Sequence, residues 1–503
     1  MTSPFSFAPL AACTLAAAVL LSACGGGGGG SSSSAATPSA TSRPPDVIPS
    51  DYQSYANLCL APRTGVDSDG LAFQDRKGTL LDELKFLRGW ADRYYLWYDE
   101  IPNNVWMADF TSTLAYFDKL KTPALTASGK PKDQFHFTYT TAEWQALTTS
   151  GQEVGYGLTW SRNGTSAPRT WLAAIVEPGS PAAGAGLQRG DMLTAVDGVD
   201  FVNTGSAAGV ATINAGLFPE RAGETHRLRI QRGASVFDVT LNASVVSSAS
   251  VKNAKVIDTP TGKVAYLTFE DFNAVAEKQL IDAFTMFQNQ GVNDLVLDMR
   301  YNGGGLLYIA AELGYMIAGP ASRDKTFERL VYNNKTAPQA PIPFMTTAYG
   351  FSSPNPVPKG QALPYLGLKR VTVLTTADTC SASEAVINGL RGIDVDVSVI
   401  GGTTCGKPYG FTPVDNCGTT YFSIEFEGVN AKNAGGFADG FAPTCTVADD
   451  LSHALGDTSE SLLAAALAYR NGSVCPVSRA RAVPMTLERP EIRKILVHPA
   501  GMR

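Results

Sequence analysis

The apolar positions of residues 79–98 recur at the spacing of an α-helix. The residues on that face are Leu80, Leu84, Leu87 and Tyr94. Thr79, followed by an acidic residue three positions later, has the spacing of a capping box and predicts the start of this helix. Helical spacing returns near residues 106–120 and 141–147. The pattern therefore predicts an N-terminal helical domain over residues 53–150.

From residue 154 to 246 the pattern changes to short segments of alternating apolar and polar positions, typical of β-strands. The motif Gly155-Tyr156-Gly157-Leu158 opens this region, and the elements Gly186-Leu187-Gln188-Arg189-Gly190-Asp191 and Val196-Asp197-Gly198 follow it. Backbone N–H groups in such a turn can bind a terminal carboxylate while a peptide adds to the sheet as an extra strand. This order of motifs resembles a PDZ domain over residues 151–248. The resemblance implies a peptide-binding role for Gly155, Tyr156, Gly157 and Leu158. A small β-barrel without a ligand is the alternative.

Residues 249–476 alternate between predicted strands and helices, which indicates an α/β layer. Residues 294–300 form an apolar run typical of a buried strand, and a glycine-rich segment at 301–305 follows it. A second apolar strand is predicted over 371–376, with a helix after it. The fold class expected for the chain is therefore α+β and multidomain. Residues 477–503 form a polar tail without an assigned role.

The first fifty residues do not fit a folded domain. The apolar stretch 10–24 ends in Leu21-Ser22-Ala23-Cys24, which resembles the lipobox of bacterial lipoproteins. The resemblance implies a signal peptide over residues 1–23, a lipid on the Cys24 thiol, and a lipid-anchored protein of the bacterial envelope that faces the periplasm or the cell surface. Residues 24–52 are rich in Gly, Ser and Pro, as in a flexible tether. An uncleaved N-terminal tail is the alternative.

Composition and charge narrow the range of functions. The chain has 503 residues, of which 44% are hydrophobic and 17% charged, as expected for a globular protein. Its formal net charge of -6 offers no basic surface for DNA or RNA. We therefore expect no nucleic-acid partner.

The chain contains eight cysteines, of which Cys13 and Cys24 lie in the predicted signal and lipidation site. An even set remains for the folded part, and an oxidising compartment favours disulfides among its members. That set is Cys59, Cys380, Cys405, Cys417, Cys445 and Cys475. Six cysteines allow 15 pairings, and we favour Cys405 with Cys417. The four histidines are scattered and no C-x-x-C pair occurs, so we expect neither a metal site nor a cofactor.

The most informative chemistry lies at Ser381 and Lys407. Ser381 falls on the turn between the strand at 371–376 and the helix after it, and Lys407 follows the next predicted strand. Serine is a weak nucleophile until a base removes its proton, and a desolvated lysine can do so. The N–H of Ala382, at a helix start, is placed to stabilise an oxyanion. The pair therefore predicts a serine–lysine hydrolase.

Less specific interpretations of these segments remain open. Ser383 could be the nucleophile, and Lys407 could form a surface ion pair. Cys380 is a weaker candidate, because no histidine lies in its motif. Glu384 could act as a base, although its place on the helix favours capping or packing.

Three ordered motifs resemble the C-terminal processing (tail-specific) serine peptidases. They are the run from Asp298 to Gly305, the Ser381-Ala382-Ser383-Glu384 segment and Gly406-Lys407. The resemblance implies Ser381 as nucleophile, Lys407 as base, and Gly304 with Ala382 as oxyanion donors. It also implies a crotonase-like α/β serine peptidase core and polypeptide substrates that are engaged through their C-termini.

Two positions depart from the family pattern. Phe411 stands where many relatives have a Gln or Glu that orients the lysine, so the third catalytic residue is missing or comes from elsewhere, such as Glu425 or Glu427. Gly303 replaces the usual proline of the oxyanion turn. Two functions therefore compete. One is a serine endopeptidase of the envelope, and the other is a weak or inactive relative that binds peptides or ligands.

Overall fold

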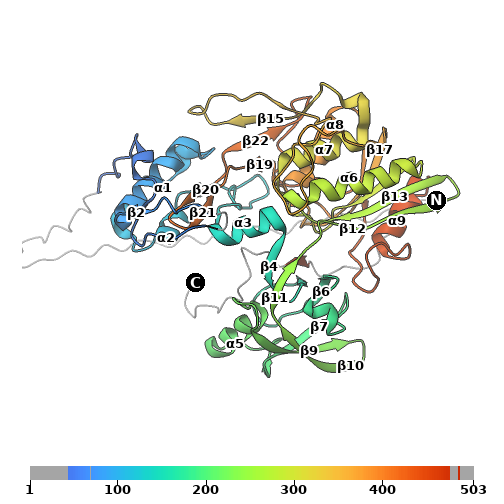
Figure 1. The fold of residues 1–503 in the computed structure, drawn as a ribbon, viewed down its shortest axis with the longest axis horizontal. Helices are drawn as coiled ribbons and strands as arrows, with labels where there is room; N and C mark the ends of the chain where they lie inside the picture. The colour runs from blue at the N-terminus through green and yellow to red at the C-terminus, as the bar shows by residue number, and fades with distance from the viewer. Residues whose placement is uncertain (1–42, 68–69, 476–484, 488–503) are drawn as a thin grey trace, which may run out of the picture. The chain divides into compact units, whose positions relative to one another are not determined.

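The structure, a computed structural model, describes residues 43–67, 70–475 and 485–487 (Figure 1). The described residues from Pro45 onward belong to one compact unit. The predicted signal peptide, Cys24 and most of the tether lie outside the described residues. Among the residues described, no helix has the length and apolar character needed to cross a membrane.

The N-terminal helical region begins as the sequence predicts. Thr79 caps α1 (Leu80–Tyr94), because its hydroxyl accepts a hydrogen bond from the Asp82 N–H and its own N–H donates to the Asp82 carboxylate. The remaining helices are α2 (Thr113–Phe117) and α3 (Thr141–Ser150), so the helical content near residues 106–120 is shorter than expected. The apolar side of α1 packs against Tyr421 and Ile424, far along the chain.

A strand and a disulfide join this region to the distal part of the core. β3 (Phe137–Thr140) pairs antiparallel with β21 (Thr419–Phe422), which also pairs with β20 (Val414–Asn416). Cys59 is bonded to Cys417. The N-terminal helices therefore form a continuous structure with the segment that follows Lys407.

The region that resembles a PDZ domain is a sheet with the strand order β10-β9-β7-β6-β5-β24, in which β8 pairs with β7. Its strands are β5 (Leu158–Arg162), β6 (Trp171–Val176), β7 (Met192–Val196), β8 (Val199–Asp200), β9 (Thr225–Arg232), β10 (Ser235–Asn242) and β24 (Thr486–Leu487). Two helices accompany it, α4 (Pro181–Gly184) and α5 (Ala207–Leu217). β4 (Gln152–Gly155) precedes these strands in the chain, and β11 (Ser244–Ser247) follows β10. β4 and β11 pair antiparallel with each other as a separate two-stranded sheet. Trp171, Phe201 and Leu228 are fully buried in its core.

The core sheet has the order β12-β13-β14-β17-β18-β23 and is parallel from β13 onward. Its strands are β12 (Val251–Thr259), β13 (Gly262–Phe269), β14 (Asp294–Asp298), β17 (Arg370–Thr375), β18 (Asp396–Gly401) and β23 (Cys445–Thr446). A smaller sheet beside it contains β16 (Ile342–Pro343), β15 (Thr326–Tyr332), β22 (Phe426–Val429) and β19 (Tyr409–Gly410).

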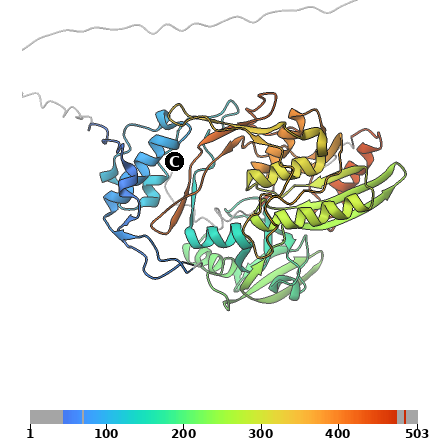
Figure 2. The same ribbon diagram turned by 45° about the horizontal axis from the view of Figure 1, so that its top comes forward.

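Helices cover both faces of the core sheet. α6 (Ala274–Asn289), α7 (Leu307–Ala318) and α8 (Ala382–Gly392) pack on one face, and α9 (Ser461–Arg470) packs on the other (Figures 1 and 2). Alternate residues of each strand point to opposite layers, which explains why these strands are apolar throughout. The expected α+β multidomain fold, with an α/β core and a separate sheet, is therefore confirmed. The carboxyl ends of β14, β17 and β18 meet at one edge of the sheet.

The predicted pairing of Cys405 with Cys417 is wrong. Cys405 is bonded to Cys380, and the third disulfide joins Cys445 to Cys475. β17 and β18 are neighbouring parallel strands, so the segments that follow them lie together and bring Cys380 and Cys405 to a Cα separation of 5.3 Å. Cys417 instead lies at the turn of the β20–β21 hairpin, beside the N-terminal region.

Candidate active site

Ser381 occupies a sharp turn between β17 and α8. Its backbone has φ 54° and ψ -115°, a conformation that side-chain-bearing residues rarely adopt and that often marks functional sites. Gly304 lies directly against it, since a Cβ at that position would come within 2.7 Å of the Ser381 Cβ. Ser383 is fully buried and donates its hydroxyl to the Asn302 carbonyl. Ser383 therefore has a structural partner, while Ser381 is partly exposed.

One buried carboxylate connects the turn at Ser381 to the loop that carries Lys407. Oε2 of Glu384 accepts the Ser381 N–H at 3.0 Å and the Lys407 N–H at 2.8 Å. Oε1 accepts the Gly406 N–H at 2.9 Å and the Thr404 hydroxyl at 2.6 Å. Burial raises the pKa of Glu384, although the Thr404, Lys407, Gly406 and Ser381 donors all act to lower it. The backbones of residues 381 and 407 therefore lie within two hydrogen-bond lengths of each other.

The Cys380–Cys405 disulfide is a second link between the same two segments. Cys380 precedes Ser381 directly, and Cys405 lies two residues before Lys407. Among the described residues, the only cluster of potential metal ligands is Cys380, Glu384 and Cys405. Because its two sulfurs are bonded to each other, this cluster offers no thiolate to a metal. Its arrangement holds the two loops together instead.

The Lys407 side chain is 8% exposed and lies between two aromatic rings. Its Nζ is 4.1 Å from the centroid of the Phe411 ring and 4.9 Å from that of Phe135. Phe135 belongs to the N-terminal region, so this region helps to enclose the lysine. The aromatic face of Phe411 occupies the place of the polar residue that the family pattern predicts.

The two acidic alternatives for a third residue contact loop N–H groups. Glu425 accepts the Thr412 N–H at 3.3 Å, and burial raises the pKa of its carboxyl to about 7. Glu427 accepts the Gly436 N–H at 2.8 Å. Both carboxylates therefore support neighbouring loops.

The two predicted oxyanion donors differ in their present contacts. The Gly304 N–H donates to Oδ1 of Asn302 at 2.9 Å, and that amide is fixed by a further bond to the Phe269 carbonyl. The N–H of Ala382 donates to no protein acceptor among the described residues. The Ala382 N–H therefore has no acceptor among the described residues, whereas the Gly304 N–H is engaged by Asn302.

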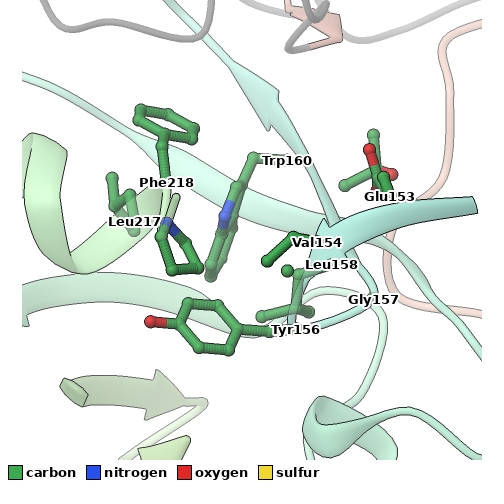
Figure 3. Close-up of a pocket in the computed structure, with 11 residues that line it drawn as sticks. Glu153, Val154, Tyr156, Gly157, Leu158, Trp160, Leu217 and Phe218 are labelled. Atoms are coloured by element: carbon green, nitrogen blue, oxygen red, sulfur yellow. The ribbon is translucent and has the colours of Figure 1, made fainter. Parts of the chain in front are cut away.

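The predicted peptide-binding loop lines a pocket. Gly155, Tyr156, Gly157 and Leu158 form one wall, and Leu217 and Phe218 at the end of α5 form another (Figure 3). Tyr156 is buried and donates its hydroxyl to the Gly216 carbonyl, which ties the loop to α5. Gly157 has a positive φ and lies against Ser180, so a larger residue would not fit.

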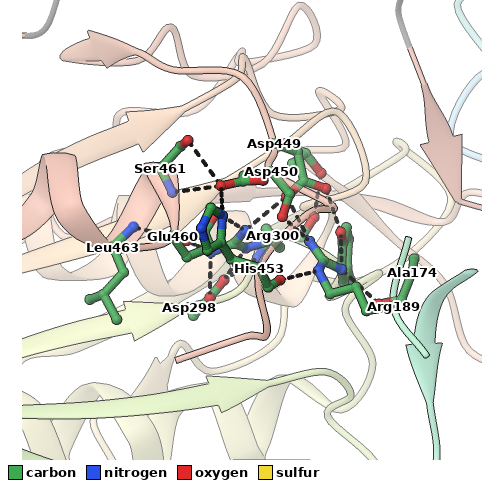
Figure 4. Close-up of polar contacts among 12 residues, drawn as sticks. Ala174, Arg189, Asp298, Arg300, Asp449, Asp450, His453, Glu460, Ser461 and Leu463 are labelled. Atoms are coloured by element: carbon green, nitrogen blue, oxygen red, sulfur yellow. Dashed lines mark hydrogen bonds and ion pairs between the residues drawn. The ribbon is translucent and has the colours of Figure 1, made fainter. Parts of the chain in front are cut away.

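A polar network that the sequence interpretation missed joins the PDZ domain to the core. Arg189 donates to the Tyr301 hydroxyl at 2.7 Å and to Asp449 at 3.0 Å (Figure 4). Arg300 binds the fully buried Asp298 and Glu460 and the partly exposed Asp449. Burial disfavours the charge of Asp449, but Arg300 and Arg189 outweigh it and lower its pKa. The sequence signal that could have indicated this network is Arg300, a charged residue at the end of the apolar run 294–300.

The structure thus combines an α/β core, which presents Ser381 at a strand-to-helix turn, with a separate PDZ-type sheet. Residues 263–446 match peptidase family S41, and residues 174–214 match the PDZ domain family. These matches confirm the resemblance: residues 263–446 are similar to peptidase family S41, residues 174–214 are similar to PDZ domains, and similar proteins bear the name carboxyl-terminal-processing protease.

The carboxyl-terminal-processing protease of Picosynechococcus sp. is 30% identical over 172 residues, which cover 33% of this chain and 39% of the relative. That of Synechocystis sp. is 28% identical over 205 residues, covering 39% and 46%. The matched stretch thus spans less than half the length of these relatives. A solved Bacteroides fragilis structure assigned to the S41 proteases is 27% identical, with a TM-score of 0.58, and the match covers 77% of this chain and 97% of that one.

Proposed function

We propose that this protein is a serine endopeptidase that uses Ser381 and Lys407 as a catalytic dyad. The observation that carries the proposal is the convergence of the two loops on Glu384, reinforced by the Cys380–Cys405 disulfide. A dyad needs its members held at a fixed separation, because misplacement by about 1 Å can cost on the order of 10²-fold in rate. The strained turn at Ser381 supports its role as the nucleophile.

The reaction follows from these positions. Neutral Lys407 takes the proton from the Ser381 hydroxyl as its oxygen attacks the scissile carbonyl carbon. The Ala382 N–H stabilises the resulting oxyanion, and the Gly304 N–H joins it once Asn302 is released. Lys407 then gives its proton to the leaving amine, and water hydrolyses the acyl-enzyme by the reverse roles. The loop at Gly155–Leu158 would bind substrate C-termini while the peptide adds to the edge of β5.

A second function, peptide binding with weak or no catalysis, has one specific observation in its favour. Phe411 places an aromatic face beside the Lys407 amine, and the Gly304 N–H is engaged by Asn302. An efficient peptidase needs the Lys407 amine available to Ser381 and the Gly304 N–H available to the oxyanion, so both contacts favour weak catalysis.

The test uses protein containing residues 45–503 and an unfolded polypeptide such as casein. Ser381→Ala and Lys407→Ala should each lower hydrolysis by at least about 10³-fold, because members of a dyad act as a unit. A serine-directed phosphonate should label the parent protein, and peptide mapping should locate the label on Ser381. If Ser381→Ala cleaves as well as the parent protein, the peptidase assignment is wrong. Inert parent protein that still binds C-terminal peptides would favour the second function.

We further propose that Cys24 carries the lipid and that the protein is held at the bacterial envelope, facing the periplasm or the cell surface. The motif before Cys24 supports this, as do the three disulfides, which are stable in an oxidising compartment. In a bacterial host, the parent protein should incorporate radiolabelled palmitate and sediment with membranes. Cys24→Ser should abolish both, and labelling that persists in this variant would refute the anchor.

A further inference from the structure

The edge of β5 is the surface that a bound peptide needs. β6 pairs with one edge of β5 along its whole length. A peptide that enters the pocket at Gly155–Leu158 and adds to the sheet must therefore use the opposite edge of β5. That opposite edge is already occupied at its far end by β24, from the same chain.

The pairing of β24 has the geometry of a bound ligand. Thr486 lies opposite Arg162 and Leu487 lies opposite Ser161, in antiparallel register. The chain thus runs along β5 from Arg162 toward the Gly155–Leu158 loop. A peptide whose terminal carboxylate is bound at that loop runs in the same direction. At about 3.3 Å per residue, a peptide that extends along β5 for more than three or four residues meets the positions held by β24.

The other side of β24 contacts the peptidase core beside the candidate nucleophile. The Leu487 N–H donates to Oδ2 of Asp378 at 2.9 Å, three residues before Ser381. The Leu487 side chain is 7% exposed and packs with Ala174 and Ile175 of β6 and with Tyr301 of the core. β24 therefore lies between the edge of the PDZ sheet and the turn that leads to Ser381.

We propose that residues 485–487 form a built-in competitor strand, which a peptide ligand must displace from β5 before it can bind. The inference rests on the proposed peptide-binding role of this edge, and it does not depend on catalysis. Because a peptide binds only while this edge is open, its apparent Kd equals the intrinsic Kd divided by the fraction of time that the edge is open. A peptide that displaces it also removes the Leu487 contact with Asp378, so peptide binding and the Ser381 turn are coupled through one segment.

The test compares the parent protein with Leu487→Glu, which places a charge in the apolar cluster and releases the strand. The matched control is Val236→Glu, which adds the same charge to exposed β10 at the opposite edge of the same sheet. The probe is a fluorescein-labelled hexapeptide with an apolar C-terminal residue and a free carboxylate, measured by fluorescence anisotropy. If β24 is bound nine-tenths of the time, Leu487→Glu should lower the Kd about tenfold, and Val236→Glu should leave it unchanged. A labelled tripeptide, too short to reach Ser161, should bind both proteins equally.

A second measurement uses the unaltered protein and so does not depend on how the variant folds. Saturation with the hexapeptide should accelerate amide hydrogen exchange across residues 485–487, since the Leu487 N–H loses its acceptor. An equal hexapeptide Kd in the parent protein and Leu487→Glu, or unchanged exchange at 485–487 on saturation, would overturn the competitor strand alone. Absence of peptide binding to either protein would overturn the peptide-binding role as well. Loss of casein hydrolysis with peptide binding intact would bear only on the peptidase proposal.

Discussion

The loops around Ser381 and the edge of β5 are held in opposite ways. Four donors converge on the Glu384 carboxylate, and a disulfide joins the same two loops. β24 is held by two ladder positions, one hydrogen bond from the Leu487 N–H to Asp378, and the packing of the Leu487 side chain. The contacts on Glu384 and the disulfide hold the two loops at a fixed separation. The few contacts of β24 allow another strand to replace it. Chemistry and recognition therefore place different demands on the same chain.

The largest effect is expected at Glu384. In Glu384→Ala, four donors lose their acceptor, three of them in buried hydrogen bonds, and each unsatisfied buried group costs about 1–3 kcal/mol. Casein hydrolysis should fall by about 10²-fold or more, and the melting temperature should drop. Glu384→Gln keeps one acceptor oxygen and should give intermediate values of both. Activity near the parent level in Glu384→Ala would show that the loops are positioned by other contacts.

The disulfides allow a matched comparison within the chain. Cys380–Cys405 and Cys445–Cys475 span 25 and 30 residues, so each should contribute about 3.5 kcal/mol by constraining the unfolded chain. Replacing both cysteines of either pair by alanine should therefore lower stability similarly in chemical denaturation. Only the Cys380→Ala/Cys405→Ala variant should also lower kcat, by about tenfold, because the dyad loops become less constrained. Equal kcat values in the two double variants would remove the disulfide from the positioning argument.

Phe411 tests how the lysine is oriented. Phe411→Gln supplies the polar side chain of the family pattern and should raise kcat several-fold, with KM little changed, in steady-state assays of a fluorogenic peptide. Phe411→Leu keeps the apolar character and is the control. If kcat falls in both variants alike, the aromatic ring is itself required beside Lys407.

The smallest effect concerns pH and Glu425. Burial raises its pKa to about 7 from an ordinary value near 4.5. Between these values the folded protein binds a proton that the unfolded chain releases, so the free energy of unfolding should decrease as the pH rises from about 4.5 to 7. The slope from one proton is at most about 1.4 kcal/mol per pH unit. Glu425→Gln should flatten this part of the profile in urea titrations, and an unchanged slope would show that the carboxyl titrates normally.

Local patterns in the sequence predicted much of the fold. The capping box at Thr79, the buried strand at β14 and the turn that carries Ser381 all follow from periodicity, glycine and capping residues over short stretches. The pairing of Ser381 with Lys407 was predicted from their places after two successive strands and from the resemblance to the tail-specific peptidases. Their catalytic roles remain predictions.

What the sequence could not indicate depends on contacts between distant segments. The Cys59–Cys417 bond has a sequence separation of 358, and no local pattern selects it among the possible pairings. β24 contains two residues, too few for any periodicity to register. The contact between Arg189 and Tyr301 depends on how two domains meet. In each case the two contacting segments come together only when the whole fold is assembled.

The Cys59–Cys417 bond has one more consequence, for the durability of the molecule. It closes a covalent ring around the whole PDZ domain and most of the core. A single cut anywhere inside that ring would leave the fragments attached, so a nicked molecule would migrate as one species until a reductant is added. The disulfide therefore keeps the fold covalently connected after a single break of the backbone.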